Sequence, residues 1–266
     1  MSKVIFSKFQ KIYFFRLYLF LEASWSIFIV YEYRMIAENL EILRKRIEQA
    51  CQKCRRNKEE VQLIAVSKTF SADLIQEAID AGQIEFGENY VQELQEKQIT
   101  LADRVIHWHF IGHLQSNKVK YIADFASLIH SVDDLNLGRE ISKRAERCNR
   151  LQDVLVEIHT TNEATKFGVQ PEQAIAFIKE LSQLSHLRVC GLMTMGPFSD
   201  NPDDSRSSFR CVAELKSLIE AEGIVNVQMR HLSMGMTHDF EVAIEEGATL
   251  IRIGTALFGR RTKNLN

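Results

Sequence analysis

Proline and glycine are scarce in this chain, whose 266 residues include three prolines and 12 glycines. That scarcity excludes a collagen-like or linker-rich protein, because such chains depend on these two residues. Neither sign of charge is in excess, since 33 lysines and arginines against 35 acidic residues leave a net charge of −2. A near-neutral chain without a basic stripe gives no support to nucleic-acid binding.

Cysteine is also sparse. Five cysteines at irregular spacings argue against a disulfide framework and favour a reducing compartment, so we expect a cytoplasmic protein. Cys51 and Cys54 form a C-x-x-C pair, but no second pair accompanies it, as a zinc site of that type requires. We interpret the pair as part of a solvated helix end beside Lys53, Arg55 and Arg56.

Residues 1–34 differ from the rest, since they hold six of the 16 phenylalanines, four of the six tyrosines and no glycine. A membrane anchor over 17–31 is one interpretation, although Arg16 and Glu22 interrupt the roughly 20 apolar residues that a span needs. A signal peptide is a second, but a cleavage site of small residues is missing. The third is a misassigned extension before a true start at Met35. We divide the chain into this extension (1–34) and one domain (35–266), and expect no membrane partner.

From Met35 onward, helical and strand-like patterns alternate. Apolar residues at spacings of three and four predict an amphipathic helix over 36–54. Short apolar, β-prone runs predict strands at 61–67, 84–87, 107–112, 127–132, 153–158, 187–193, 227–233 and 249–254. Helical patterns lie between them at 72–81, 90–99, 116–122, 135–148, 171–184, 204–222 and 240–246.

Strict alternation of this kind predicts an α/β protein with a parallel sheet. Eight units in about 230 residues match the number and size of a single (β/α)8 TIM barrel. A doubly wound open sheet is the alternative, but it usually has a glycine-rich turn after its first strand. Here that strand ends in Ser67, Lys68 and Thr69 instead.

The chemistry of such a barrel lies where its strands end. Lys68 ends the first strand, and burial at a barrel mouth would favour its neutral, nucleophilic amine. The alternative is a lysine that extends its charged end to water. Opposite it, the last two strands end in Ser233, Gly235, Gly254 and Thr255, whose hydroxyl and N–H groups suit a phosphate.

Arg252 lies deeper on the same face of the last strand as Gly254. A cation there needs an acceptor, for which a ligand ring nitrogen and a buried carboxylate are the two candidates. A nucleophilic amine at Lys68 suits a ligand with an aldehyde, the last two loops suit a phosphate, and Arg252 suits a ring nitrogen. Pyridoxal 5′-phosphate has all three groups.

Six motifs carry a specific resemblance that covers nearly all of the chain after Met35. They lie at 65–69 (AVSKT), 86–93 (FGENYVQE), 108–118 (WHFIGHLQSNK), 191–195 (GLMTM), 232–236 (LSMGM) and 251–259 (IRIGTALFG). With them the chain resembles the YggS/PROSC family of pyridoxal phosphate homeostasis proteins. Two positions depart from the family pattern: His113 replaces a common proline, and Thr237 replaces a serine but keeps a hydroxyl.

The resemblance implies a fold type III pyridoxal phosphate barrel, similar to the N-terminal domain of alanine racemase. It implies that Lys68 forms an internal aldimine and that Arg252 faces the pyridine nitrogen. It also implies that Ser233, Gly254 and Thr255 hold the phosphate. The predicted cofactor-binding set is Lys68, Asn89, Ser233, Arg252, Gly254 and Thr255.

Three functions remain open at this stage. Racemases of this fold take their second base, a tyrosine, from an added C-terminal domain, whereas here the tyrosines after residue 33 are Tyr90 and Tyr121. We therefore expect a non-catalytic carrier or regulator in pyridoxal phosphate homeostasis, monomeric, with pyridoxal phosphate-dependent apoenzymes as partners. The alternatives are an amino-acid racemase and a phosphosugar lyase that uses Lys68 without a cofactor.

Three histidines also invite a metal interpretation. His107 and His109 share one face of a predicted strand, and His113 follows it. A metal site would need carboxylate or histidine ligands at other strand ends, which carry mostly serine, glycine, methionine and lysine. We therefore expect no metal, and interpret these histidines as structural or close to the cofactor.

Overall fold

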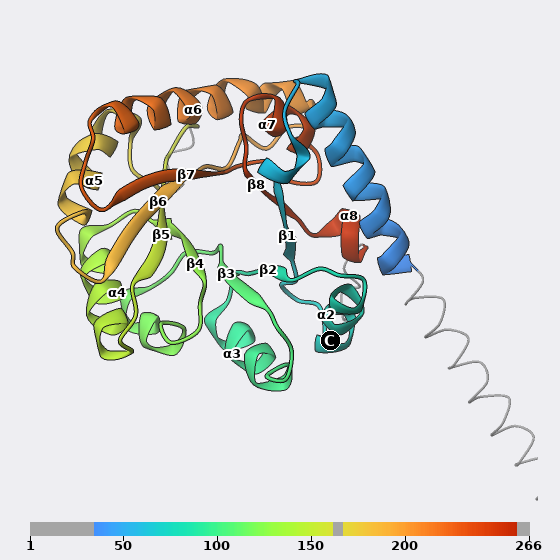
Figure 1. Cartoon of the computed structure of the whole chain (residues 1–266), viewed down its shortest axis with the longest axis horizontal. Coiled ribbons are helices and arrows are strands. Elements are labelled where there is room, and N and C mark those ends of the chain that lie inside the picture. The colour runs from blue at the N-terminus through green and yellow to red at the C-terminus, as the bar shows by residue number, and fades with distance from the viewer. Residues whose placement is uncertain (1–34, 162–166, 260–266) are drawn as a thin grey trace, which may run out of the picture.

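The centre of the molecule is a closed barrel of eight parallel strands (Figure 1). This computed structural model describes residues 35–161 and 167–259, so the interpretations of residues 1–34 concern residues outside those described. The first strand pairs with the last as well as with the second, which confirms the predicted barrel and excludes an open sheet. The strands are β1 Gln62–Val66, β2 Glu85–Glu88, β3 His107–Phe110, β4 Leu128–Val132, β5 Gln152–Glu157, β6 Leu187–Met193, β7 Val227–Ser233 and β8 Leu250–Ile253.

Helices follow the strands and surround the barrel (Figure 1). The α-helices are α2 Ala72–Asp80, α3 Val91–Thr100, α4 Leu135–Arg147, α5 Ala174–Leu181, α6 Arg206–Ala221, α7 Phe240–Glu245 and α8 Thr255–Phe258. Four short 3₁₀ helices are η1 Lys58–Glu60, η2 Ser116–Tyr121, η3 Pro171–Gln173 and η4 Pro202–Ser205. The helix expected over 116–122 is thus a 3₁₀ helix, a form that short connecting segments commonly adopt.

A further helix over residues 35–53 packs beside the last part of the barrel domain, as the blue helix in Figure 1 shows. Asn39 donates a hydrogen bond to the backbone of Leu257 in α8 (2.9 Å). Arg46 forms an ion pair with Glu241 of α7 (2.6 Å). The two ends of the described chain are therefore held together by these contacts.

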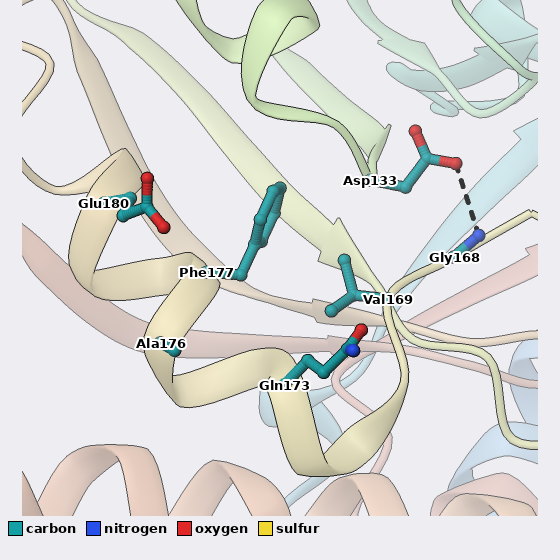
Figure 2. A pocket seen from close by; sticks show the side chains of 7 residues that line it. All are labelled: Asp133, Gly168, Val169, Gln173, Ala176, Phe177 and Glu180. Atoms are coloured by element: carbon teal, nitrogen blue, oxygen red, sulfur yellow. Dashed lines mark hydrogen bonds between the residues drawn. The ribbon is translucent and has the colours of Figure 1, made fainter.

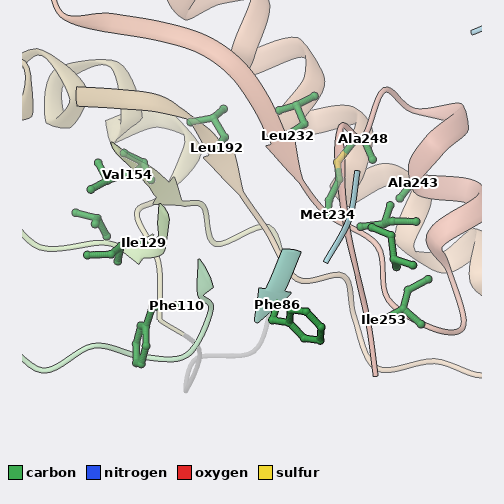
Figure 3. Close-up of a cluster of buried hydrophobic side chains, with 14 of the residues drawn as sticks. Phe86, Phe110, Ile129, Val154, Leu192, Leu232, Met234, Ala243, Ala248 and Ile253 are labelled. Atoms are coloured by element: carbon green, nitrogen blue, oxygen red, sulfur yellow. The ribbon is translucent and has the colours of Figure 1, made fainter. Parts of the chain in front are cut away.

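Apolar side chains fill the layer between the strands and the helices (Figure 3). Phe86 and Trp108 lie on neighbouring strands, are almost fully buried, and have ring centroids 5.9 Å apart. Cys51 belongs to this layer with 1% exposure, so the expectation of a solvated cysteine pair was wrong. The apolar face of its helix takes Cys51 into the core, whereas Cys54 is half-buried and donates to the Ala50 carbonyl.

The space inside the barrel is less apolar. A small cluster there consists of Ile64, Leu128, Leu155, Cys190, Met193 and Leu250. The interior also contains buried polar groups from β3, β4, β7 and β8, namely His109, His130, Ser233 and Arg252. Within the described ranges, no helix has the length and apolar character that crossing a membrane requires.

Candidate functional site

The neighbouring strands β7, β8 and β1 bring together most of the predicted cofactor residues. Ile64 of β1 pairs with Arg252 of β8, and Ala65 pairs with Ile253. Gly254 therefore lies beside the end of β1, where Lys68 follows two residues later and is half-buried. This exposure is compatible with both interpretations of Lys68, a nucleophilic amine and a lysine that extends its charged end to water.

A buried polar cluster holds the turn that carries Lys68. Ser67 donates its hydroxyl proton to Glu88 of β2 (2.6 Å). Lys97 of α3 donates to the Ser67 carbonyl and to Glu88, both at 2.7 Å. Burial raises the pKa of Glu88, although the charge of Lys97 opposes that effect. The turn after β1 is thereby anchored to β2 and α3 on the outside of the barrel.

Arg252 is buried inside the barrel with 5% exposure. It donates to the Ser233 hydroxyl (2.6 Å) and to the Thr194 carbonyl (2.9 Å). Burial lowers the pKa of Arg252 to about 10, while the charges of Glu157 and Asp239 act to raise it, so the guanidinium stays charged near neutral pH. Its hydrogen bonds go to neutral oxygens, and these carboxylates act on it through their charge.

The two loops that follow β7 and β8 are shaped by close approach of the backbone. At Gly235, φ is +91°, and a Cβ atom would lie 2.5 Å from the side chain of Ala243. At Gly254, a Cβ atom would lie 3.1 Å from the Val66 carbonyl oxygen. Thr255, the first residue of α8, is exposed. Positions 235 and 254 therefore favour glycine, because atoms of neighbouring elements already occupy the place that a side chain would take.

Asn89 follows β2 at the same end of the barrel. Its Oδ1 atom is buried and has no hydrogen-bond partner among the described residues. A buried acceptor without a partner is rare in folded proteins and marks a place where a ligand or a water would bind. Its backbone lies against Gly112, where a Cβ atom would come within 2.4 Å of the Asn89 carbonyl oxygen.

Glu157 ends β5 on the other side of the mouth. Burial raises the pKa of Glu157 to about 7; the charge of Asp133 adds to that effect, and the charge of Arg252 opposes it. A small pocket of about 130 Å³ lies against Glu157 and is also lined by Thr160 and Met195. The mouth therefore contains a carboxyl group that can exchange a proton near neutral pH.

A larger pocket, of about 310 Å³, lies beside the barrel mouth (Figure 2). Phe177 and Glu180 of α5 line one side of it, and Asp133, which follows β4, lines the other. Asp133 accepts a hydrogen bond from the Gly168 backbone (3.2 Å). None of the predicted cofactor residues lines this pocket, so it does not form part of the candidate site.

Of the three histidines considered for a metal, two share a carboxylate partner and the third lies against an aromatic ring. His107 and His109 both contact Glu85 (2.8 and 2.7 Å). The ring of His113 stacks on that of Phe167, with centroids 3.8 Å apart. In the part of the chain that the structure describes, no group of three or more histidine, cysteine or acidic side chains is placed to hold a metal ion.

Sequence reasoning missed His130, Glu157 and Glu88. His130 and Glu157 belong to predicted strands, where alternation was the available signal because residues two apart share a face, whereas Glu88 lies one residue beyond the predicted strand 84–87. Leu155 faces inward, so Glu157 does as well, and the same argument carries from Leu128 to His130. Glu88 faces outward, and it matters for the site because its buried ion pair with Lys97 helps to hold the turn after β1.

The fold and the mouth define a barrel of the alanine racemase type. Residues 38–262 match the family described as alanine racemase, N-terminal domain. The pyridoxal phosphate homeostasis protein of Aquifex aeolicus is 46% identical over 224 residues, which are 84% of this chain and 97% of that protein. The chain therefore belongs to the family of pyridoxal phosphate homeostasis proteins, as the sequence motifs predicted.

Solved structures agree with this assignment. PipY of Synechococcus elongatus, solved with pyridoxal phosphate bound, is 36% identical, with a TM-score of 0.73, over 84% of this chain and 100% of that one. An alanine racemase of Clostridium difficile has a TM-score of 0.66 at 14% identity, which shows a shared fold alone. This chain covers 58% of that racemase, against 87% of its own length.

Proposed function

We propose that this protein binds pyridoxal 5′-phosphate reversibly through Lys68 and serves as a carrier or regulator of the cofactor. The observation that carries the proposal is the register of β1 on β8, which pairs Ile64 with Arg252 and brings the end of β1, two residues before Lys68, beside Gly254. The structure of PipY with this cofactor and the names of the relatives support it.

The residues at the mouth fit this cofactor. When bound, pyridoxal phosphate supplies an aldehyde that condenses with a lysine amine and acts as an electron sink. The ends of β7 and β8 offer the hydroxyl groups of Ser233 and Thr255 to a phosphate. The unpartnered Asn89 Oδ1 offers a further contact.

Each predicted residue then has a separate task. Lys68 would hold the cofactor at its aldehyde group, and the turn that carries Lys68 is held by Ser67 and the Glu88–Lys97 pair. Arg252 faces the pyridine nitrogen as a donor. Because a guanidinium does not readily release a proton, that nitrogen stays unprotonated, which weakens the electron sink. A weak electron sink suits storage of the cofactor better than transamination.

An amino-acid racemase is the second candidate, and Glu157 is the observation that favours it. A carboxyl with a pKa of about 7 at the mouth meets the requirement for a proton-exchanging group. The tyrosines of the described chain lie elsewhere: Tyr90 is exposed after β2, and Tyr121 belongs to η2. A carrier remains the better supported function, since the relatives carry the name of homeostasis proteins.

Titration of the cofactor-free protein with pyridoxal phosphate tests the proposal. We expect saturable one-to-one binding with a new visible absorbance band, and little turnover of amino acids. Lys68→Ala should lose the band, whereas Lys120→Ala, on the exposed side of η2, should keep it. Racemisation with a kcat in the usual enzyme range of about 1–10³ s⁻¹ would replace the carrier by the racemase.

The wider cellular role follows from the same proposal. A carrier hands its cofactor to pyridoxal phosphate-dependent apoenzymes in the cytoplasm, and we propose that it does so as a monomer. Cells without the protein should show altered free pyridoxal phosphate and disturbed amino-acid pools. Rescue by the wild type but not by Lys68→Ala would link that effect to the bound cofactor, and a D-amino-acid auxotrophy would contradict it.

A further inference from the structure

A continuous chain of hydrogen bonds crosses the interior of the barrel. Glu85, the first residue of β2, contacts His109 Nε2 through its carboxylate (2.7 Å). His109 Nδ1 contacts His130 Nε2 (2.9 Å), and His130 Nδ1 contacts Ser233 Oγ (2.9 Å). Ser233 in turn accepts a hydrogen bond from Arg252 (2.6 Å). The chain thus connects the start of β2 with a residue of the cofactor site.

The end of this chain at β2 is open to solvent. His107, whose side chain is 48% exposed, contacts the second carboxylate oxygen of Glu85 (2.8 Å). The middle is closed, because His109 is 5% exposed and His130 is fully buried. Each buried hydrogen bond in this chain needs one donor and one acceptor. The nitrogen that carries the proton in one histidine ring therefore determines which nitrogen carries it in the next ring.

The charge of Glu85 fixes one end. Burial acts to raise the pKa of Glu85, but hydrogen bonds from His109 and His107 outweigh it and the pKa is lowered. An ionised carboxylate only accepts, so His109 donates through Nε2–H. If His109 is neutral, its Nδ1 accepts from His130 Nε2–H, and His130 Nδ1 accepts from the Ser233 hydroxyl. Every donor then points from Ser233 toward Glu85.

A proton on His109 reverses this order. Both ring nitrogens of His109 then donate, so His130 Nε2 must accept. Burial lowers the pKa of His130 well below its usual value, with the charges of His109 and Arg252 adding to the effect, so that ring stays neutral. Its single proton therefore lies on Nδ1 and is donated to Ser233 Oγ. The Ser233 hydroxyl proton is released from the chain.

We propose that Glu85, His109, His130 and Ser233 form a one-proton relay, in which His109 and His130 are positioning residues that set whether Ser233 can donate to the cofactor's phosphate. The reversal balances as follows. Ser233 takes one proton from solvent at the mouth, passes its own proton to His130 Nδ1, and His130 passes its Nε2 proton to His109 Nδ1. Net uptake is one proton, held by His109 against Glu85.

The ligand end of this relay rests on the proposed function, because it assumes that Ser233 faces the phosphate. A phosphate accepts hydrogen bonds strongly, so it favours the reversed, protonated chain. Ligand binding and proton uptake then strengthen each other by linkage. Affinity for a phosphate-like anion should consequently rise as the pH falls.

Other charged groups face the relay from the strands around it. They are His107 on β3, Asp153 on β5, Arg230 and His231 on β7, and Arg252 on β8. Burial lowers the pKa of His231 to about 4, and the charge of Arg230 adds to the effect, so this ring stays neutral above that pH. At one end of the relay His109 contacts Glu85, and at the other end Arg252 donates to Ser233.

Nitrogen NMR of the histidine rings in the cofactor-free, full-length protein tests the relay directly. We expect the proton of His130 to lie on Nε2 at high pH and on Nδ1 at low pH. This change of nitrogen, called the crossing below, should fall within roughly pH 5–8, where histidines change charge. His109→Gln offers a matched variant, since its amide donates to Glu85 and accepts from His130 but gains no proton. In that variant His130 should keep its proton on Nε2, whereas His186→Gln, outside the relay, should leave the crossing unchanged.

A second measurement separates the relay from the cofactor proposal. Sulfate remains a dianion over this pH range, and we expect its affinity for the wild type to rise about tenfold from high to low pH, with no rise in His109→Gln. A His130 proton that stays on one nitrogen throughout, or a crossing that persists in His109→Gln, overturns the relay. A crossing without any change in sulfate affinity overturns its coupling to the ligand. Failure of pyridoxal phosphate to bind at any pH would instead contradict the proposed function.

Discussion

The two faces of the same eight strands differ in kind. The outer face is apolar and packs against the helices, as Phe86 and Trp108 do on β2 and β3. The inner face carries a hydrogen-bonded polar chain that includes His109, His130 and Arg252. The outer face resembles the core of any α/β protein, whereas the inner face places buried charge where apolar side chains would pack with less cost.

This difference assigns stability to the outer face of the strands and function to the inner face. Burying polar groups is costly unless each is satisfied, so a fold does not need them in its centre. Arg252, which belongs to this polar chain, pairs with β1 two residues before that strand ends, so the proposed function places the chain close to the ligand. We therefore expect changes on the outer face to act on stability, and changes on the inner face to act on ligand affinity and pH dependence.

The largest expected effect is on the outer face. Phe86→Ala removes a fully buried ring and should lower the free energy of unfolding by about 3–5 kcal/mol. Chemical denaturation of the cofactor-free protein measures this, with Ile99→Ala, 76% exposed on α3, as the control that changes it little. The folded fraction of Phe86→Ala should bind the cofactor normally. A much weaker affinity in that fraction would mean that the two faces are not separate.

Glu157→Gln tests the inner face through its pH dependence. The folded protein raises the pKa of Glu157 from 4.5 to about 7, so folding favours the protonated form. Wild type is therefore penalised as the pH rises through this window, and the penalty is absent at low pH. The variant should gain about 2–3 kcal/mol over wild type between about pH 5 and about pH 8. A difference in the free energy of unfolding between the variant and wild type that stays constant across this range would contradict the prediction. Glu172→Gln, at an exposed position, is the control.

Arg252→Lys should have a smaller effect. A lysine keeps the charge but lacks the fork that reaches both Ser233 and Thr194. We expect pyridoxal phosphate affinity to fall about tenfold, measured by equilibrium dialysis. Arg139→Lys, exposed on α4, should leave it unchanged. Equal affinities in wild type and Arg252→Lys would show that the guanidinium does not contact the ligand.

The smallest effect is expected for a chain that starts at Met35. The barrel pattern is complete from that residue, so we propose that residues 1–34 are dispensable for folding and cofactor binding. The shortened protein should remain in solution and bind pyridoxal phosphate with an affinity ratio of about one to the full chain. Aggregation of the shortened protein, or loss of cofactor, would assign these residues to the domain.

The alternation of elements could be predicted because the outer face obeys simple rules. Strands 187–193 and 227–233 were placed at their observed bounds. The helix expected over 171–184 was less accurate, because η3 begins it and α5 ends at Leu181. Local pattern does not report which hydrogen bonds a short helix makes.

The site was predictable where it lies at strand ends and not where it lies inside the barrel. Lys68, Ser233 and Gly254 follow apolar runs, so their position at the mouth is visible in the sequence. His130 and Glu85 lie within or at the start of their strands, and their contact with His109 depends on how β2, β3 and β4 pair with one another. That contact joins three strands, and no single segment contains it.

The most direct test of the central claim is borohydride reduction of the cofactor-loaded protein, followed by mass spectrometry of its peptides. We predict one covalent adduct, located on Lys68, with loss of the visible absorbance band. In Lys68→Ala that adduct should be absent while phosphate-driven, non-covalent binding persists more weakly. A fully occupied adduct on another lysine, or an unchanged adduct in Lys68→Ala, would contradict the account.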